Sequence, residues 1–263
     1  MDLGIKGKVA LVTAASQGLG KAVTLQLAAE GVKVAICSRN QEILDEAVHE
    51  IKTETGGSIQ GYVCDVTDEN GVKNMIEDIV GDFGSIDILV CNAGGPPAGS
   101  ALDFNLNDYR EALELNLLST INLCNLAVPI MQKESWGRII VITSVSVKQP
   151  IDTLALSNTA RAGATGYIKS LSNLVAKDGI TVNAICPGYT KTKRVENLAN
   201  AFEANGNGTI KDFYSKLEND IPMKRIGTTR EFGQTAAFLA SQGAGYITGI
   251  SLQVDGGYIK SLF

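Results

Sequence analysis

A glycine-rich turn near the start of the chain has the residue types and spacing that suit phosphate binding. The apolar run Val9–Thr13 reads as a buried strand, AASQGLG follows as residues 14–20, and a helical pattern begins at Leu19. Gly18 lets backbone approach a pyrophosphate, Gly20 lets the helix pack closely, and the helix N-terminus offers free amides. An ordinary tight turn is the alternative. The position in the first strand–turn–helix unit favours a dinucleotide site.

The end of the second predicted strand bears on which dinucleotide is bound. Lys33–Cys37 continues into Ser38-Arg39-Asn40, with no Asp or Glu where a ribose diol would be held. Arg39 instead suits a 2′-phosphate, since a guanidinium pairs well with phosphate oxygens. The sequence therefore favours NADP(H) over NAD. The alternative is a surface arginine that begins the next helix.

Strand-like and helical patterns alternate along the whole chain, which predicts right-handed βαβ crossovers. Several strands are apolar on both faces, as in a parallel sheet covered on both sides. We therefore expect an α/β fold, a doubly wound parallel sheet of the Rossmann type. The expected strands are Val9–Thr13, Lys33–Cys37, Ile59–Cys64, Ile86–Cys91, Arg138–Thr143, Ile180–Ile185 and Ser251–Val254. The expected helices are Leu19–Glu30, Gln41–Thr55, Glu69–Gly81, Leu106–Gln132, Ala160–Lys177 and Arg230–Ala240.

The chain of 263 residues contains no Pro/Gly/Ser-rich linker and no internal repeat, so a single dinucleotide-binding domain over residues 1–263 is expected. One stretch, from Pro187 to about Pro222, has only weak patterning. A long connection in a compact domain is usually functional. We expect a substrate loop or lid at about residues 188–222.

Composition narrows the partners and the compartment. The net charge of −5 argues against non-specific binding to nucleic acid or anionic membranes, and no apolar run is long enough to span a bilayer. The N-terminus does not resemble a signal peptide. Five cysteines without a Cys-x-x-Cys pair indicate free thiols in a reducing cytoplasm, with Cys37, Cys64 and Cys91 as buried small apolar residues. The single histidine, His49, lies in a charged segment, so no metal site is expected.

The chain resembles the single-domain short-chain dehydrogenases/reductases over nearly its whole length. The matching segments are Thr13–Gly20, with Ala14 in place of the first glycine, Cys64-Asp65-Val66, Asn92-Ala93-Gly94, Asn116, Pro187-Gly188-x-x-x-Thr192 and Tyr246–Gly257. The resemblance implies an adenine contact at Asp65 and a nicotinamide segment after Pro187. The coenzyme residues it implies, with those above, are Thr13, Ala15, Ser16, Gln17, Gly18, Leu19, Ser38, Arg39, Asp65, Val66, Asn92, Ala93, Gly94, Arg161, Pro187, Gly188, Thr190 and Thr192.

The resemblance breaks at the catalytic pair. The family uses a Ser, then a Tyr whose pKa is lowered by a Lys four residues later. Here the Ser aligns with Ser144, but Ser157 stands at the Tyr position and Arg161 at the Lys position. A serine hydroxyl is a far weaker acid than a phenol, and a guanidinium cannot shuttle a proton. Tyr167 and Lys169 lie about 15 and 12 Å further along the helix axis, too far to substitute; Tyr189, near the nicotinamide segment, is another candidate.

The leading expectation is an NADP(H)-dependent oxidoreductase that interconverts a carbonyl and an alcohol, resembling 3-oxoacyl-carrier-protein reductases. Ser144 would polarise the carbonyl, Arg161 would hold the ribose, and Ser157 or a bound water would complete a proton route through Asn116. The substrate would be a small carbonyl or alcohol or an acyl thioester, and the resemblance implies a homotetramer. Two alternatives stay open: a coenzyme-binding protein with little or no turnover that acts as a sensor or partner subunit, and a lyase or isomerase.

Overall fold

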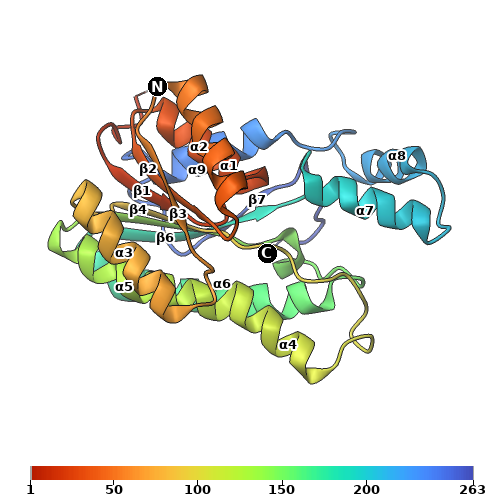
Figure 1. Ribbon diagram of the computed structural model, residues 1–263. Helices are drawn as coiled ribbons and strands as arrows, with labels where there is room; N and C mark the ends of the chain where they lie inside the picture. The colour runs from red at the N-terminus through yellow and green to blue at the C-terminus, as the bar shows by residue number, and fades with distance from the viewer. Residues whose placement is uncertain (1, 263) are drawn as a thin grey trace.

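A seven-stranded parallel sheet forms the centre of the computed structural model, which describes residues 2–262 (Figure 1). The strand order is β3-β2-β1-β4-β5-β6-β7, and every neighbouring pair is parallel. The strands are β1 (Val9–Val12), β2 (Lys33–Ser38), β3 (Ile59–Val63), β4 (Ile88–Cys91), β5 (Gly137–Ile142), β6 (Ile180–Pro187) and β7 (Ser251–Val254). The predicted doubly wound sheet is confirmed, with strand bounds that differ by at most two residues.

Helices cover both faces of the sheet, so each strand contributes side chains to two cores (Figure 1). On one face lie α1 (Gly18–Ala29), α2 (Gln41–Thr55) and α9 (Thr229–Ala240); on the other lie α3 (Glu69–Phe83), α5 (Ser119–Lys133) and α6 (Ala155–Val175). Within β1, Ala10 and Val12 belong to the first core, whereas Val9 and Leu11 belong to the second. This alternation is the period of two that a pleated strand imposes. Cys37, Cys64 and Cys91 are buried in the second core, as predicted.

The predicted helix Leu106–Gln132 is confirmed as one helical segment, which contains a π-helical turn that the sequence analysis did not predict. The structure has α4 (Leu106–Leu113), a π-helical turn (Glu114–Leu118) and then α5. By length and composition the 28 residues Leu106–Lys133 could cross a membrane. However, Leu123, Cys124 and Met131 pack into the second core beneath the sheet. One side of this segment therefore packs against the sheet.

The helix predicted at Ala160–Lys177 begins five residues earlier than expected, at Ala155, and ends at Val175. Its N-cap is Leu154, which has no side chain able to cap the helix, so the usual start signal is missing. Short 3₁₀ turns lie on both sides, at Val145–Val147 and Ala176–Asp178. The early start places Ser157 in the first turn of α6.

The weakly patterned stretch after Pro187 contains two helices that the sequence analysis missed. α7 (Lys193–Ala204) and α8 (Ile210–Asp220) project together beyond β7 at one end of the sheet (Figure 1). Thr209 and Asp212 cap α8 reciprocally. The Phe202 and Phe213 rings, 5.6 Å apart between centroids, pack the two helices together. The predicted lid region is thus a helical pair.

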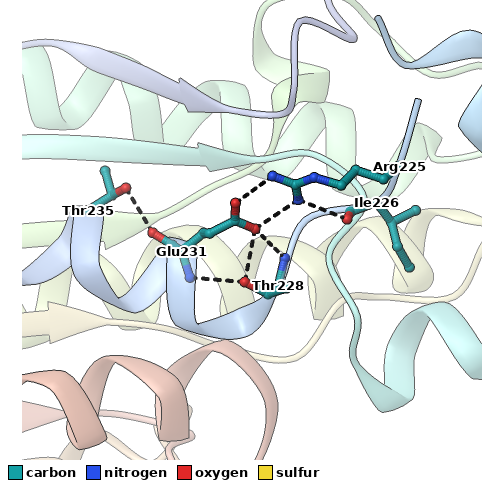
Figure 2. A network of polar contacts seen from close by, with 5 residues as sticks. All are labelled: Arg225, Ile226, Thr228, Glu231 and Thr235. Carbon is teal, nitrogen blue, oxygen red and sulfur yellow. Dashed lines mark hydrogen bonds and ion pairs between the residues drawn. The ribbon is translucent and has the colours of Figure 1, made fainter. Parts of the chain in front are cut away.

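The N-terminus of α9 is fixed by a polar network (Figure 2). Thr228 Oγ1 accepts a hydrogen bond from Glu231 N, and the Glu231 carboxylate accepts one from Thr228 N at 2.8 Å. Both Arg225 terminal nitrogens donate to the same carboxylate, at 2.6 and 3.0 Å. These contacts lower the pKa of Glu231 to about 2, with the Arg225 hydrogen bond as the largest cause. The network joins the start of α9 to the segment that follows α8.

Candidate active site

A cleft of about 440 Å³ opens at the carboxyl ends of the central strands. Ligands bind in this position in open parallel sheets, where the strand order reverses; here β1 lies between β2 and β4. The walls come from the turn after β1, from the segments that follow β4, β5 and β6, and from the first turns of α6 and α7. Segments distant in sequence therefore meet around one cavity.

The turn after β1 is held in place by Thr13 and Asn92. The Thr13 hydroxyl donates to Asn92 O at 2.6 Å and accepts from Asn92 N at 2.8 Å. The Asn92 side-chain amide donates to Ala14 O at 3.1 Å. Three hydrogen bonds thus tie the turn to the end of β4. Thr13 and Asn92 therefore hold the backbone of the turn in position.

Two positions of the turn have left-handed backbone conformations. Gly18 has φ +59°, and a Cβ there would meet only the Thr192 methyl, at 3.9 Å. Ala14, which replaces the first glycine of the family pattern, has φ +46°. At Gly20 the helix packs so closely that a Cβ would lie 2.7 Å from Ala14 O. The space in front of Gly18, at the first residue of α1, fits the phosphate group that a dinucleotide would bring.

Most of the predicted coenzyme residues meet in this part of the molecule. Thr13 and Ala15 are buried behind the turn, and Val66 is buried after β3. Ser16 Oγ donates to Ser38 Oγ at 3.3 Å, which joins the first two strand ends. The predicted residues that line the cleft itself are Gln17, Gly18, Leu19, Asn92, Ala93, Gly94, Arg161, Pro187, Gly188, Thr190 and Thr192.

Arg39 and Asp65 line a second, neighbouring hollow rather than the main cleft. The Arg39 guanidinium lies 3.8 Å from an Asp65 carboxylate oxygen, and 77% of its side-chain surface is exposed. Thr67 donates to Asp65 through its amide and its hydroxyl, and the amide bond is the largest cause of the lowered pKa of that carboxyl. Arg39 is thus loosely held, whereas Asp65 is fixed in place.

Arg161 and Ser157 form a hydrogen-bonded pair that lines the cleft. Arg161 Nε donates to Ser157 Oγ at 3.2 Å, and Nη1 donates to Ile142 O at 2.8 Å. Both residues are 8% exposed. Burial lowers the pKa of the Arg161 guanidinium to about 10, and the charge of nearby Arg194 contributes in the same direction. At neutral pH Arg161 is a buried cation directly behind a serine hydroxyl.

Ser144 and Asn116 have different relations to the cleft. Ser144 lines it, and its Oγ accepts from Ser146 N at 3.1 Å, which leaves its own proton available to a ligand. Asn116 lies in the π-helical turn behind the lining, and its Nδ2 donates to Gly94 O at 3.2 Å. Its buried Oδ1 has no partner among residues 2–262. The structure therefore brings three of the four predicted catalytic residues to the surface of the cleft.

The tyrosines near the site form no phenol–ammonium pair within the described chain. Tyr189 lines the cleft, but its ring packs edge-on against Tyr258 at 5.4 Å between centroids. Burial is the largest cause, and Tyr258 the next, of a rise in the pKa of Tyr189 to about 12. Tyr189 is therefore a weaker acid than a free phenol. Tyr167 points away and donates to Asn125 at 3.4 Å. Within the described chain, Tyr189 is the only tyrosine on the cleft wall.

Arg194 is a residue of the site that the sequence analysis missed. It lies in the first turn of α7, lines the cleft, and donates through Nη2 to Pro96 O at 3.0 Å. This contact links α7 to the Gly95-Pro96-Pro97 loop that follows β4. The available signal was two adjacent cations, Lys193 and Arg194, directly after the Pro187–Thr192 segment.

Comparisons with known proteins agree with this geometry. The family model described as Enoyl-(Acyl carrier protein) reductase matches residues 13–259. Tropinone reductase-like 3 of Erythroxylum coca is 35% identical over 253 residues, which cover 96% of this chain and 93% of the relative. The 3-oxoacyl-[acyl-carrier-protein] reductase of Escherichia coli K12 is 34% identical over 255 residues, 97% of this chain and 98% of the relative. The L-sorbose reductase of Gluconobacter frateurii, solved with NADPH and L-sorbose, has a TM-score of 0.95 at 31% identity, with both chains fully covered.

Proposed function

The chain belongs to the short-chain dehydrogenase/reductase family, and from that membership we propose an NADP(H)-dependent oxidoreductase that interconverts a carbonyl and an alcohol at an atypical proton-donor site. The observation that carries this proposal is a single cleft that extends from the phosphate turn at Gly18 to the hydroxyl-bearing residues Ser144 and Ser157. The NADPH-bound relative supports the choice of coenzyme.

The coenzyme residues divide into three groups in this proposal. The turn at Gly18 and Leu19, with the α1 N-terminus, holds the pyrophosphate. Arg39 pairs with a 2′-phosphate, and Asp65 with Val66 contacts the adenine. The segment Pro187–Thr192 lies beside the nicotinamide half, where Arg161 holds the ribose. When bound, the coenzyme supplies or accepts a hydride at the substrate carbon.

In the reduction direction, this chain must bind the carbonyl oxygen and deliver one proton to it. Ser144 and Ser157 present hydroxyls to the cleft, so both can donate to that oxygen. As negative charge develops there, the buried Arg161 cation behind Ser157 stabilises it. The proton comes from the Ser157 hydroxyl, which regains one from solvent, with Asn116 orienting the route through its unpartnered Oδ1. Ser157 thus acts as a relay rather than as a strong acid.

The second candidate is an NADP(H)-binding protein with little or no turnover, a sensor or partner subunit. The replacement of the family's Tyr and Lys by Ser157 and Arg161 is the observation in its favour. NADPH fluorescence would first measure coenzyme binding, and NADPH oxidation would then be followed with a panel of ketones and 3-oxoacyl thioesters. Binding with turnover supports the reductase, and binding without any turnover supports this second candidate.

A matched pair of variants tests the site within the reductase proposal. Ser157→Ala is expected to lower kcat at least tenfold, about 1.4 kcal/mol of activation free energy, with NADPH affinity unchanged. The control is Thr159→Ala in the same helix, where the hydroxyl donates to Ala155 O. Equal kcat values for the two variants and the wild type would contradict the role of Ser157.

The assembly and compartment belong to the same proposal. The lid at about 188–222 would close the substrate mouth with α7 and α8. We propose a homotetramer in the cytoplasm, and the five buried free thiols are compatible with a reducing compartment.

A further inference from the structure

The cleft carries positive charge, and the described residues that line it include no carboxylate that could balance this charge. Arg161, Lys193 and Arg194 all line it, whereas none of the lining residues that the structure describes is Asp or Glu. Lys193 forms an ion pair with a residue outside the cleft lining, since its Nζ lies 3.2 Å from a Glu196 carboxylate oxygen in the next turn of α7. The guanidinium groups of Arg161 and Arg194 therefore carry the net positive charge of the cavity.

Arg161 and Arg194 are both bound to neutral partners. The contacts of Arg161 are the Ser157 hydroxyl and the Ile142 carbonyl, and that of Arg194 is the Pro96 carbonyl. Neither residue has an ion pair within residues 2–262. The two charges repel each other because both residues line the same cavity, and this repulsion adds to the effect of burial in lowering the pKa of Arg161. Placing like charges together beside a partly buried cavity is costly unless an anion binds between or beside them.

Arg194 is positioned to receive such an anion. It lies over the Gly95 backbone, where a Cβ would approach its Cζ to 3.4 Å, and its Nη2 bond to Pro96 O fixes the plane of the guanidinium. A guanidinium has five N–H donors, so most remain for a ligand, and the fork geometry suits a carboxylate. Arg194 lies on the wall of the same cavity as Ser144 and Ser157, and no acidic side chain of the described lining competes for it, so it can bind an anionic group of a ligand.

We propose that the ligand of this cleft is a small oxo acid, whose carboxylate pairs with Arg194 while its carbonyl oxygen faces Ser144 and Ser157. Arg194 is then a specificity-determining residue for a charged substrate. The inference rests on the proposed reductase function for its redox step, but carboxylate binding does not require turnover. A coenzyme phosphate is the other anion that Arg194 could meet, and the test separates the two.

The experiment compares three oxo acids with their neutral methyl esters: 2-oxobutanoate, acetoacetate and 4-oxopentanoate. These place the carboxylate at increasing distance from the carbonyl. Calorimetric titration of the protein, with and without saturating NADP⁺, gives the affinities in the absence of reduction. At least one acid is expected to bind tenfold or more tightly than its ester, a difference of about 1.4 kcal/mol. Arg194→Gln should abolish that preference, and Arg194→Lys should retain part of it.

The control is Arg230→Gln, which removes an exposed arginine that is not part of the cleft lining and should leave every affinity unchanged. The inference is overturned if no acid binds at about 10 mM, if acids and esters bind equally, or if Arg194→Gln weakens NADP⁺ as much as the acid. Acid binding without any NADPH oxidation would refute the reductase activity and leave the carboxylate site standing.

Discussion

The Arg161 guanidinium donates a hydrogen bond to the Ser157 hydroxyl across 3.2 Å, one turn apart on the same face of α6. Residues four apart on a helix face one another, and in our proposal this pair takes the place of the family's Tyr and Lys. Its chemistry is different: the hydroxyl is a poor acid, and the cation is permanent at neutral pH.

Restoring the usual pair should raise ketone reduction. In the variant Ser157→Tyr with Arg161→Lys, a phenol lies next to an ammonium and can donate a proton near neutral pH. We expect kcat to increase at least tenfold, or activity to emerge where the wild type has none. Each single change should fail to do so, because a Tyr without Lys lacks the pKa shift and a Lys without Tyr has nothing to tune. A slower double variant of an efficient enzyme would place the proton donor elsewhere.

Arg39 should set the coenzyme preference. It is 77% exposed and only loosely paired with Asp65, so its guanidinium can turn to a 2′-phosphate. We expect NADPH to bind at least tenfold more tightly than NADH, about 1.4 kcal/mol, and Arg39→Ala to remove most of the difference. Fluorescence titration with both coenzymes measures this, with Arg230→Ala as a matched surface control. Equal affinities in the wild type would contradict the assignment to NADP(H).

Ala14→Gly should stabilise the fold. Ala14 has φ +46°, a conformation that costs an L-residue roughly 1–2 kcal/mol and a glycine almost nothing. The greater freedom of glycine in the unfolded chain offsets about 0.5–1 kcal/mol, so a net gain of about 0.5–1 kcal/mol is expected in urea unfolding. The control Ala201→Gly, on the exposed face of α7, should instead lose about 1 kcal/mol. If Ala14→Gly and Ala201→Gly lowered the free energy of unfolding equally, the turn at Ala14 would be unstrained.

Glu231 should contribute stability that depends on pH. Its folded-state pKa, about 2, lies below its ordinary value of 4.5, so the ionised form is favoured by folding. The contribution is therefore complete above pH 4.5 and is lost as the pH falls toward 2. Glu231→Gln should lower the urea midpoint at pH 7 and lower it less at pH near 3. The control Glu218→Gln, an exposed change on α8, should show no such dependence on pH. If Glu231→Gln lowered the urea midpoint equally at both pH values, the loss would come from packing and not from the charge of Glu231.

The sheet was predictable from sequence because its central strands β1, β4, β5 and β6 are buried on both faces. The apolar run Ile139–Ile142 of β5 is an example, and such runs are typical of parallel strands. The phosphate turn was likewise predictable, since Gly18 and Gly20 meet local requirements of backbone shape and helix packing.

Other features depend on contacts or caps that a local pattern does not contain. α6 begins after Leu154, which is not a capping residue, so the pattern gave its start five residues late. α7 and α8 are separated by Asn205-Gly206-Asn207-Gly208, a run that favours loops and concealed the helices on either side. Arg194 meets Pro96 across 98 positions of sequence, so its place in the cleft required the folded structure.

In the proposed reaction, this cleft catalyses hydride transfer between NADP(H) and a carbonyl carbon. Two samples of NADPH, deuterated on one face or on the other face of the nicotinamide C4, are each incubated with the protein and a ketone or oxo acid, and the product alcohol is analysed by mass spectrometry. We expect one deuterium on the carbinol carbon with one of the two samples only, and less deuterated alcohol with Ser157→Ala. Product without deuterium from both samples, or tight NADPH binding with no alcohol formed from any carbonyl substrate, would contradict hydride transfer in this cleft.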